Sequence, residues 1–206
     1  MTESREKRTR MRGEERRASI LAQAKKVFAE QGYAEASTSM LARASDVTEP
    51  MLYKHFGSKK GLFLAVLDNF IEGFIRRFLG SLEQQAERDL LEVLSMLLLD
   101  YRAAAMADPD GLRAFVQASV GLGDEQFNEF TREHYVDLYQ RIYHLLEQAQ
   151  GQRVLPAKLN LTAAAWGYIS LLATIANRPR LNLTDQFDEE VISEISRLWL
   201  QGLRLG

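Results

Sequence analysis

Apolar residues recur at intervals of three and four along most of this chain, which is the period of an amphipathic α-helix. The first pattern runs through Ile20, Ala24 and Phe28, and we expect it to stop at Gly32, because glycine readily adopts positive φ. Later patterns predict helices over about 88–107, 110–120, 124–149, 161–177 and 187–204. We find no alternation typical of strands, so the sequence predicts an all-α fold.

Short helical segments come between the first pattern and the long ones. One is centred on Leu41, and another covers about 48–56, where Thr48 is suited to the N-cap and Pro50 to the first turn. Ser58 is suited to cap the following helix, whose apolar stripe reaches Phe74. Two short helices separated by "ASDVT" at 44–48 predict a helix-turn-helix.

The helix-turn-helix has an inner and an outer face. We expect Asp46 to adopt positive φ in the turn, with Val47 as an apolar plug. Leu52 and Phe56, four residues apart, are expected to hold the second short helix against the first helix of the chain. This leaves an outward set that can enter a major groove: Glu49, Pro50, Met51, Tyr53 and Lys54.

Charge divides the chain in a way that the net value of −2 conceals. Residues 1–60 have 13 Lys and Arg against 8 Asp and Glu, net +5, and residues 61–206 have 13 against 20, net −7. A basic N-terminal part on an acidic body indicates a polyanionic partner, although a solvated charged face is the common alternative. The chain has no cysteine and starts with charged residues, which predicts a cytoplasmic protein without a signal peptide.

The most apolar segment, "LTAAAWGYISLLATIA" at 161–176, raises the question of a membrane span. It lies in a stretch without charge between Lys158 and Arg178, of borderline length for a bilayer. It also contains Gly167 and several hydroxyl residues, and no second span accompanies it. We therefore expect a helix buried in the core or in a subunit interface.

The stretch "ILAQAKKVFAEQGYAEASTSMLARASDVTEPMLYKHFGSKKGLF" resembles the DNA-binding domain of the TetR family of bacterial transcriptional regulators. The resemblance covers roughly 50 residues in order and register, through "FAEQGY", "LARASDVT" and "LYKHFGSK". It implies an N-terminal three-helix helix-turn-helix domain at 1–60 and a larger helical domain at 61–206 for effector binding and dimerisation. It also implies a homodimer on a near-palindromic operator in double-stranded DNA, by family default as a repressor.

The resemblance also implies roles for individual residues. Ser37 and Lys59 correspond to phosphate contacts, Tyr53 and His55 to a pair that touches phosphates or thymine methyls, and 49–51 to positions that reach bases. The full set of expected DNA contacts is Ser37, Thr38, Arg43, Thr48, Glu49, Pro50, Met51, Tyr53, Lys54, His55 and Lys59.

Three residues depart from the family pattern, and one segment precedes it. Ala36 stands where threonine is usual, Met40 where an acidic residue is common, and Asp46 where the turn has glycine. The segment "REKRTRMR" at 5–12 is interpreted either as a disordered arm that follows a DNA groove or as a solvated tail.

The C-terminal part gives two further sets of candidates. The family binds effectors between its long helices, which suggests an apolar pocket that includes Phe74, Tyr101, Phe115, Tyr139, Trp166 and Ser170. The last two helices predict a four-helix dimer interface through Leu171, Leu172, Ile175, Ile195, Leu198 and Trp199, with an intrachain core as the alternative.

Other functions have less support. His134 and Asp137 share a helix face, but one histidine and one carboxylate are too few for a metal site, so we expect neither a metal nor a cofactor. No catalytic motif is present, so an enzyme with an apolar helical pocket is disfavoured. A DNA-binding protein that responds to no ligand stays open, because a pocket depends on packing.

Overall fold

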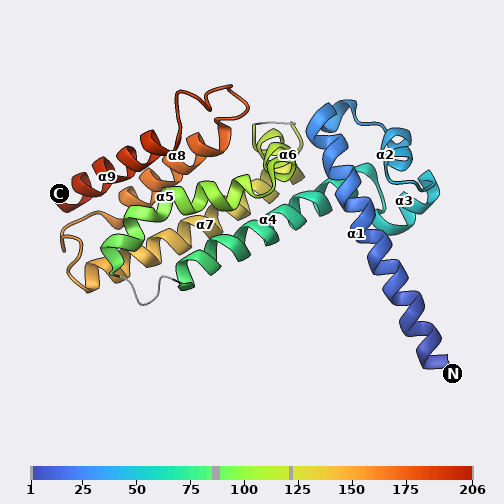
Figure 1. Ribbon diagram of the computed structural model, residues 1–206, viewed down its shortest axis with the longest axis horizontal. Coiled ribbons are helices and arrows are strands. Elements are labelled where there is room, and N and C mark those ends of the chain that lie inside the picture. The colour runs from blue at the N-terminus through green and yellow to red at the C-terminus, as the bar shows by residue number, and fades with distance from the viewer. Residues whose placement is uncertain (1, 85–88, 121–122, 206) are drawn as a thin grey trace. The chain divides into compact units, whose positions relative to one another are not determined.

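The computed structural model describes residues 2–84, 89–120 and 123–205, and helices make up most of them (Figure 1). No strand occurs among these residues, and the predicted all-α fold class is confirmed. The helices in chain order are α1 (Thr2–Glu35), α2 (Thr38–Ala44), α3 (Glu49–Phe56), α4 (Lys59–Gln84), α5 (Leu90–Met106), α6 (Pro109–Ser119), α7 (Glu125–Gly151), α8 (Leu161–Asn177) and α9 (Glu189–Leu205).

The N-terminal segment differs from its expected form. The backbone is helical from Thr2, so the segment 5–12 lies within α1 and does not precede it as a disordered arm or tail. The residues of this segment explain its helical state, because Arg, Lys and Glu are good helix formers. Glu3 and Glu6 each stand four residues before a basic residue, Lys7 and Arg10, which is the favourable order for helix pairs.

The chain folds into two compact units. The first contains Met1–Glu72 and Pro109–Val120, and the second contains Gly73–Asp108 and Gly121–Gly206. Helix α4 contributes residues to both units. Helices α1, α2, α3 and α6 therefore belong to the first unit, and α5, α7, α8 and α9 to the second.

The first unit is built around α1, which packs against α2 and α6. Ile20, Ala24 and Phe28 are all fully buried, as their spacing predicts. The rings of Phe28 and Phe63 meet edge to face with centroids 4.8 Å apart, which fixes the start of α4 against α1. Gly32 has φ 81° and interrupts the helical backbone of α1, in agreement with its predicted role.

The second unit is a helical bundle in which α8 packs on α5 and α7, and α9 packs on α5. Tyr168 of α8 is fully buried, and its hydroxyl donates a hydrogen bond of 3.3 Å to the carbonyl of Leu94. The ring of Trp199 from α9 lies against Gly167, where a Cβ atom would approach it to 2.2 Å. Over residues 2–84, 89–120 and 123–205, no helix combines the length and apolar character that crossing a bilayer requires.

Candidate nucleic-acid interface

The turn between α2 and α3 has the geometry that the sequence predicts. Asp46 has φ 53°, a conformation that aspartate tolerates better than most residues. The amide of Val47 donates to the carbonyl of Ala42 at 3.0 Å, and the amide of Asp46 donates to that of Arg43 at 3.2 Å. These bonds satisfy backbone carbonyl groups at the end of α2, and the chain then turns into α3.

Helix α3 has one buried side and one exposed side. Leu52 is 4% exposed and faces the core, whereas Tyr53 is 45% exposed and Pro50 and Lys54 are also exposed. Phe56 is half-buried, and the guanidinium of Arg17 in α1 lies 4.5 Å from its ring centroid. The predicted outer face is thus present at Pro50, Tyr53 and Lys54, whereas Glu49 and Met51, also expected to face outward, are half-buried.

Thr48 takes the N-cap position of α3 with an extended backbone, but its side chain makes no capping hydrogen bond. Neighbouring caps do form in the expected way. Ser37 accepts from the amide of Met40 at 3.1 Å at the start of α2, and Ser58 accepts from the amide of Gly61 at 2.9 Å at the start of α4.

A hydrogen bond that the sequence did not predict joins α2 to α3. The Thr38 hydroxyl donates to Oε2 of Glu49 at 2.9 Å, and both side chains are half-buried. Both residues were expected to contact DNA. Their bond sets the orientation of the Glu49 carboxylate and leaves its Oε1 atom able to accept from another donor.

Lys59 also has contacts within the protein. Its ammonium group donates to the carbonyl of Ala34 at 3.2 Å and lies 4.6 Å from the ring centroid of Tyr33. These contacts hold the charge at the junction of α1 and α4, and a lysine ammonium has further protons to donate.

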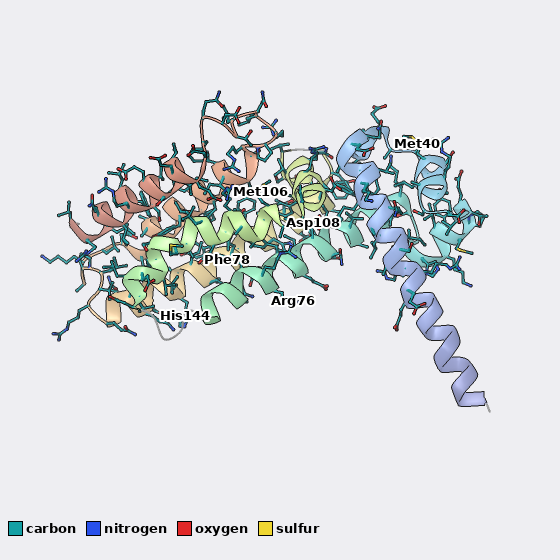
Figure 2. All side chains as sticks on the ribbon, in the orientation of Figure 1. Met40, Arg76, Phe78, Met106, Asp108 and His144 are labelled. Carbon is teal, nitrogen blue, oxygen red and sulfur yellow. The ribbon has the colours of Figure 1, made fainter. Side chains whose placement is uncertain are left out.

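The remaining predicted positions vary in exposure. Arg43 is exposed on the last turn of α2, and His55 is half-buried beside Phe56. Met40 is half-buried on α2, where Figure 2 labels it. Ala36 is fully buried in the first unit.

Two arginines of α1 adjoin α3, and sequence reasoning missed both. Arg17 covers Phe56, and the guanidinium of Arg16 lies 3.9 Å from the sulfur of Met51. Arg16 also lines a cleft of about 500 Å³ with Glu15, Ser19, Ser45, Asp46 and Val47. The sequence signal that could have pointed to these two arginines is their spacing from the basic residues at 5–12. That spacing is informative only if residues 5–12 belong to the same helix, which the sequence did not predict.

The six effector candidates are divided between the two units. Phe74 and Tyr101 meet edge to face at 5.2 Å and contact Phe78, which Figure 2 labels, and burial raises the pKa of the Tyr101 phenol. Tyr139 stacks on Trp166 at 5.0 Å, but Trp166 is 44% exposed, and Ser170 is exposed too. Phe115 belongs to the first unit, where its ring lies 5.9 Å from that of Phe70.

The six interface candidates also divide. Leu172 and Ile175 are 1% and 3% exposed within one chain, so both side chains are buried in the core of the second unit. Leu198 is 54% exposed, and Leu171, Ile195 and Trp199 are half-buried.

His134 is occupied by a protein contact, because its Nδ1 lies 2.7 Å from the carbonyl of Phe130.

Taken together, α2, the turn and α3 define a helix-turn-helix protein. Residues 20–66 match the family model described as bacterial regulatory proteins of the tetR family. The resemblance seen in the sequence is therefore confirmed over these residues, which match the family's N-terminal domain.

Comparisons with individual proteins agree. The chain is similar to the HTH-type transcriptional activator FasR of Mycolicibacterium smegmatis, with 38% identity over 66 residues, 32% of this chain and 30% of that protein. It is also similar to the HTH-type transcriptional repressor ComR of Escherichia coli, with 41% identity over 58 residues, 28% of each chain. The matches thus span less than a third of these relatives.

The similarity of fold extends over nearly the whole chain. A solved TetR-family transcriptional regulator from Cytophaga hutchinsonii has a TM-score of 0.74 over 95% of this chain and 98% of that chain, at 16% identity. The second unit therefore has the fold of the corresponding part of that regulator.

Proposed function

We propose that the protein is a cytoplasmic DNA-binding transcriptional regulator that binds a near-palindromic operator as a homodimer. The observation that carries this proposal is α3, which exposes Pro50, Tyr53 and Lys54 opposite the buried Leu52 in a TetR-family domain. The relatives are named as an activator and a repressor, and we favour repression. The proposal assigns no enzymatic activity.

In this proposal the residues divide into base-reading and backbone-binding groups. Oε1 of Glu49 accepts from a cytosine amine, while Pro50 and Met51 make apolar contacts such as those with thymine methyls. Backbone phosphates are bound by hydroxyl, basic and aromatic residues around α3, namely Ser37, Arg43, Thr48, Tyr53, Lys54, His55 and Lys59.

The two groups give different outcomes when they are mutated. The probe is the duplex that the wild-type chain enriches from a random library, together with single-base variants of that duplex. Tyr53→Ala should weaken binding to every duplex by a similar factor, whereas Met51→Ala should change which base is preferred. If Met51→Ala lowered the affinity for all duplexes equally, the base-reading role of α3 would be wrong.

Dimerisation is proposed to use the exposed apolar residues of α8 and α9. Leu198 is the most exposed candidate at 54%, and Trp166 on α8 is 44% exposed. Leu198→Glu should produce monomers in sedimentation and abolish operator binding. Leu181→Glu is the matched control, because Leu181 is 49% exposed outside both helices. Monomers from neither variant would contradict this interface.

A small, mostly apolar effector is proposed to bind the second unit near Phe74 and Tyr101. The effector would favour a form of the dimer in which the two copies of α3 no longer match successive major grooves of the operator, which lie roughly 34–36 Å apart. Compounds that raise the melting temperature should weaken operator binding, and the operator should weaken binding of the compound by the same factor.

The alternative is a regulator that responds to no ligand. The mutual contacts of Phe74, Phe78 and Tyr101 favour it, because these rings fill the space between them. A broad panel of apolar and aromatic compounds that leaves both the melting temperature and DNA affinity unchanged would decide for this alternative.

A further inference from the structure

Methionine supplies all the sulfur in this chain. The sequence has six methionines and no cysteine, so the thioether is the sulfur group that an oxidant can modify. Side chains are described for Met40, Met51, Met96 and Met106, and all four are half-buried. Because small oxidants reach half-buried thioethers from solution, exposure alone does not distinguish these four residues.

Met51 differs from the other three in what lies against its sulfur. Nη1 of Arg16 in α1 is 3.9 Å from the Met51 sulfur and can donate a hydrogen bond to it. Among the methionine side chains that the structure describes, Met51 is the one whose sulfur contacts a charged donor. A thioether is a weak acceptor, so this bond is weak while the sulfur is reduced.

The position of Met51 connects its polarity to DNA binding. Met51 is in the first turn of α3, where its amide donates to the carbonyl of Thr48 at 3.0 Å. The proposed function gives its side chain an apolar contact with a base, such as one with a thymine methyl. Arg16 also lines the cleft of about 500 Å³ beside Ser45 and Asp46, so the guanidinium at the sulfur is reached by solvent.

We propose that Met51 is an oxidation site, at which conversion of the thioether to the sulfoxide by hydrogen peroxide lowers operator affinity. This proposal rests on the proposed function. A sulfur lone pair attacks one peroxide oxygen and forms the S–O bond while the O–O bond breaks. The sulfur loses two electrons, the peroxide gains them, and the second oxygen leaves as water with both peroxide protons. Methionine sulfoxide reductases reverse the oxidation.

The added oxygen atom changes the side chain in two ways. A flexible apolar group becomes polar, so its apolar contact with a base is lost. The sulfoxide oxygen is also a stronger acceptor than the thioether sulfur, and Arg16 is in position to donate to it. The oxidised side chain is therefore held against α1 and away from the groove.

Oxidation of another methionine is the competing explanation for a loss of affinity. Met40 is the matched control, because it is half-buried on α2 of the same helix-turn-helix, where Figure 2 labels it. Its sulfur contacts no charged donor among the described side chains. Leucine is close to methionine in volume and has no sulfur, so Met51→Leu and Met40→Leu separate the two sites.

The first experiment treats the full-length wild type and both leucine variants with hydrogen peroxide. Peptide mass spectrometry locates the sulfoxides, and fluorescence anisotropy measures affinity for the duplex that the wild-type chain selects from a random library. Each protein is compared with itself before treatment. We expect the wild type and Met40→Leu to lose at least about fivefold in affinity, the lower end of what one lost base contact costs. Treatment with the reductase should restore both.

Met51→Leu should change by less than about twofold on oxidation, because it keeps the other methionines and lacks the proposed site. An equal loss in Met51→Leu and the wild type would overturn the proposal. So would a wild type that shows no sulfoxide at Met51, or one that is oxidised there and keeps its affinity.

A second measurement needs no DNA and tests the contact with Arg16. Oxidation should lower the melting temperature more in Arg16→Leu than in the wild type, by about 2–4 °C, because the wild type gains a charged hydrogen bond to the sulfoxide. Equal shifts would overturn the role of Arg16. If the wild-type chain selected no duplex, the proposed function would fail and the effect on operator affinity with it, whereas this thermal comparison would still decide whether Arg16 binds the sulfoxide of Met51.

Discussion

The hydrogen bond between Thr38 and Glu49 predicts a measurable coupling between α2 and α3. Thr38→Val removes the hydroxyl donor and keeps the β-branched shape. Hydrogen bonds to charged groups contribute about 1.5–3 kcal/mol when shielded from water. Both partners are half-buried, so the carboxylate can turn partly toward solvent, and we expect a loss below this range, about 1 kcal/mol. For a chain of this length, that lowers the melting temperature by about 2–4 °C.

A double-mutant cycle with Glu49→Ala isolates the bond. The measurement is urea unfolding of the wild type, both single variants and the double variant, with a predicted coupling of about 1 kcal/mol. Ser39→Ala, at an exposed position next to Thr38, is the control and should cost nothing. Additive effects within about 0.3 kcal/mol would refute the reasoning. Thr38→Val should also reduce the preference for one base more than overall affinity, because Glu49 then loses its fixed orientation.

Three other predictions concern packing, pH and the N-terminal extension. Gly167→Ala should cost about 1–3 kcal/mol in unfolding free energy, because the added Cβ would stand 2.2 Å from the Trp199 ring, whereas Gly202→Ala, with open space, should not destabilise. Burial raises the pKa of the Tyr168 phenol above the value near 10 that it has in the unfolded chain. The folded state therefore loses stability as the pH rises above about 10, by up to about 1.4 kcal/mol per pH unit. Tyr168→Phe should make this alkaline loss of unfolding free energy shallower in urea titrations. Gly13→Ala should raise the helix content of α1 in circular dichroism, because alanine favours helix over glycine by about 1 kcal/mol, and an unchanged spectrum would contradict a continuous helix through this position.

Local patterns account for what the sequence could predict. The period of apolar residues locates the long helices to within a few residues, and Asp46 and Ser58 act where short-range turn and capping rules place them. The extension of α1 was missed for a physical reason. Residues 5–12 contain a single apolar residue, Met11, so they show no apolar stripe, and their helical state depends on propensity and charge spacing.

Contacts between elements distant in sequence could not be predicted in the same way. The bonds of Thr38 to Glu49 and of Lys59 to Ala34 depend on how helices cross, which periodicity does not determine. The sequence also could not predict which face of α8 is buried, because a helix that is apolar nearly all round has no polar side to indicate its orientation. Leu172 and Trp166 are similar in the sequence pattern, yet one is buried and the other exposed.

The central claim is specific binding of duplex DNA by two copies of the helix-turn-helix. The most direct test is in-vitro selection with the purified chain and a random duplex library at moderate salt, followed by sequencing. We predict enrichment of an inverted repeat whose half-sites lie about one helical turn, or a multiple of it, apart. Failure of a folded, dimeric chain to enrich any sequence would contradict the claim.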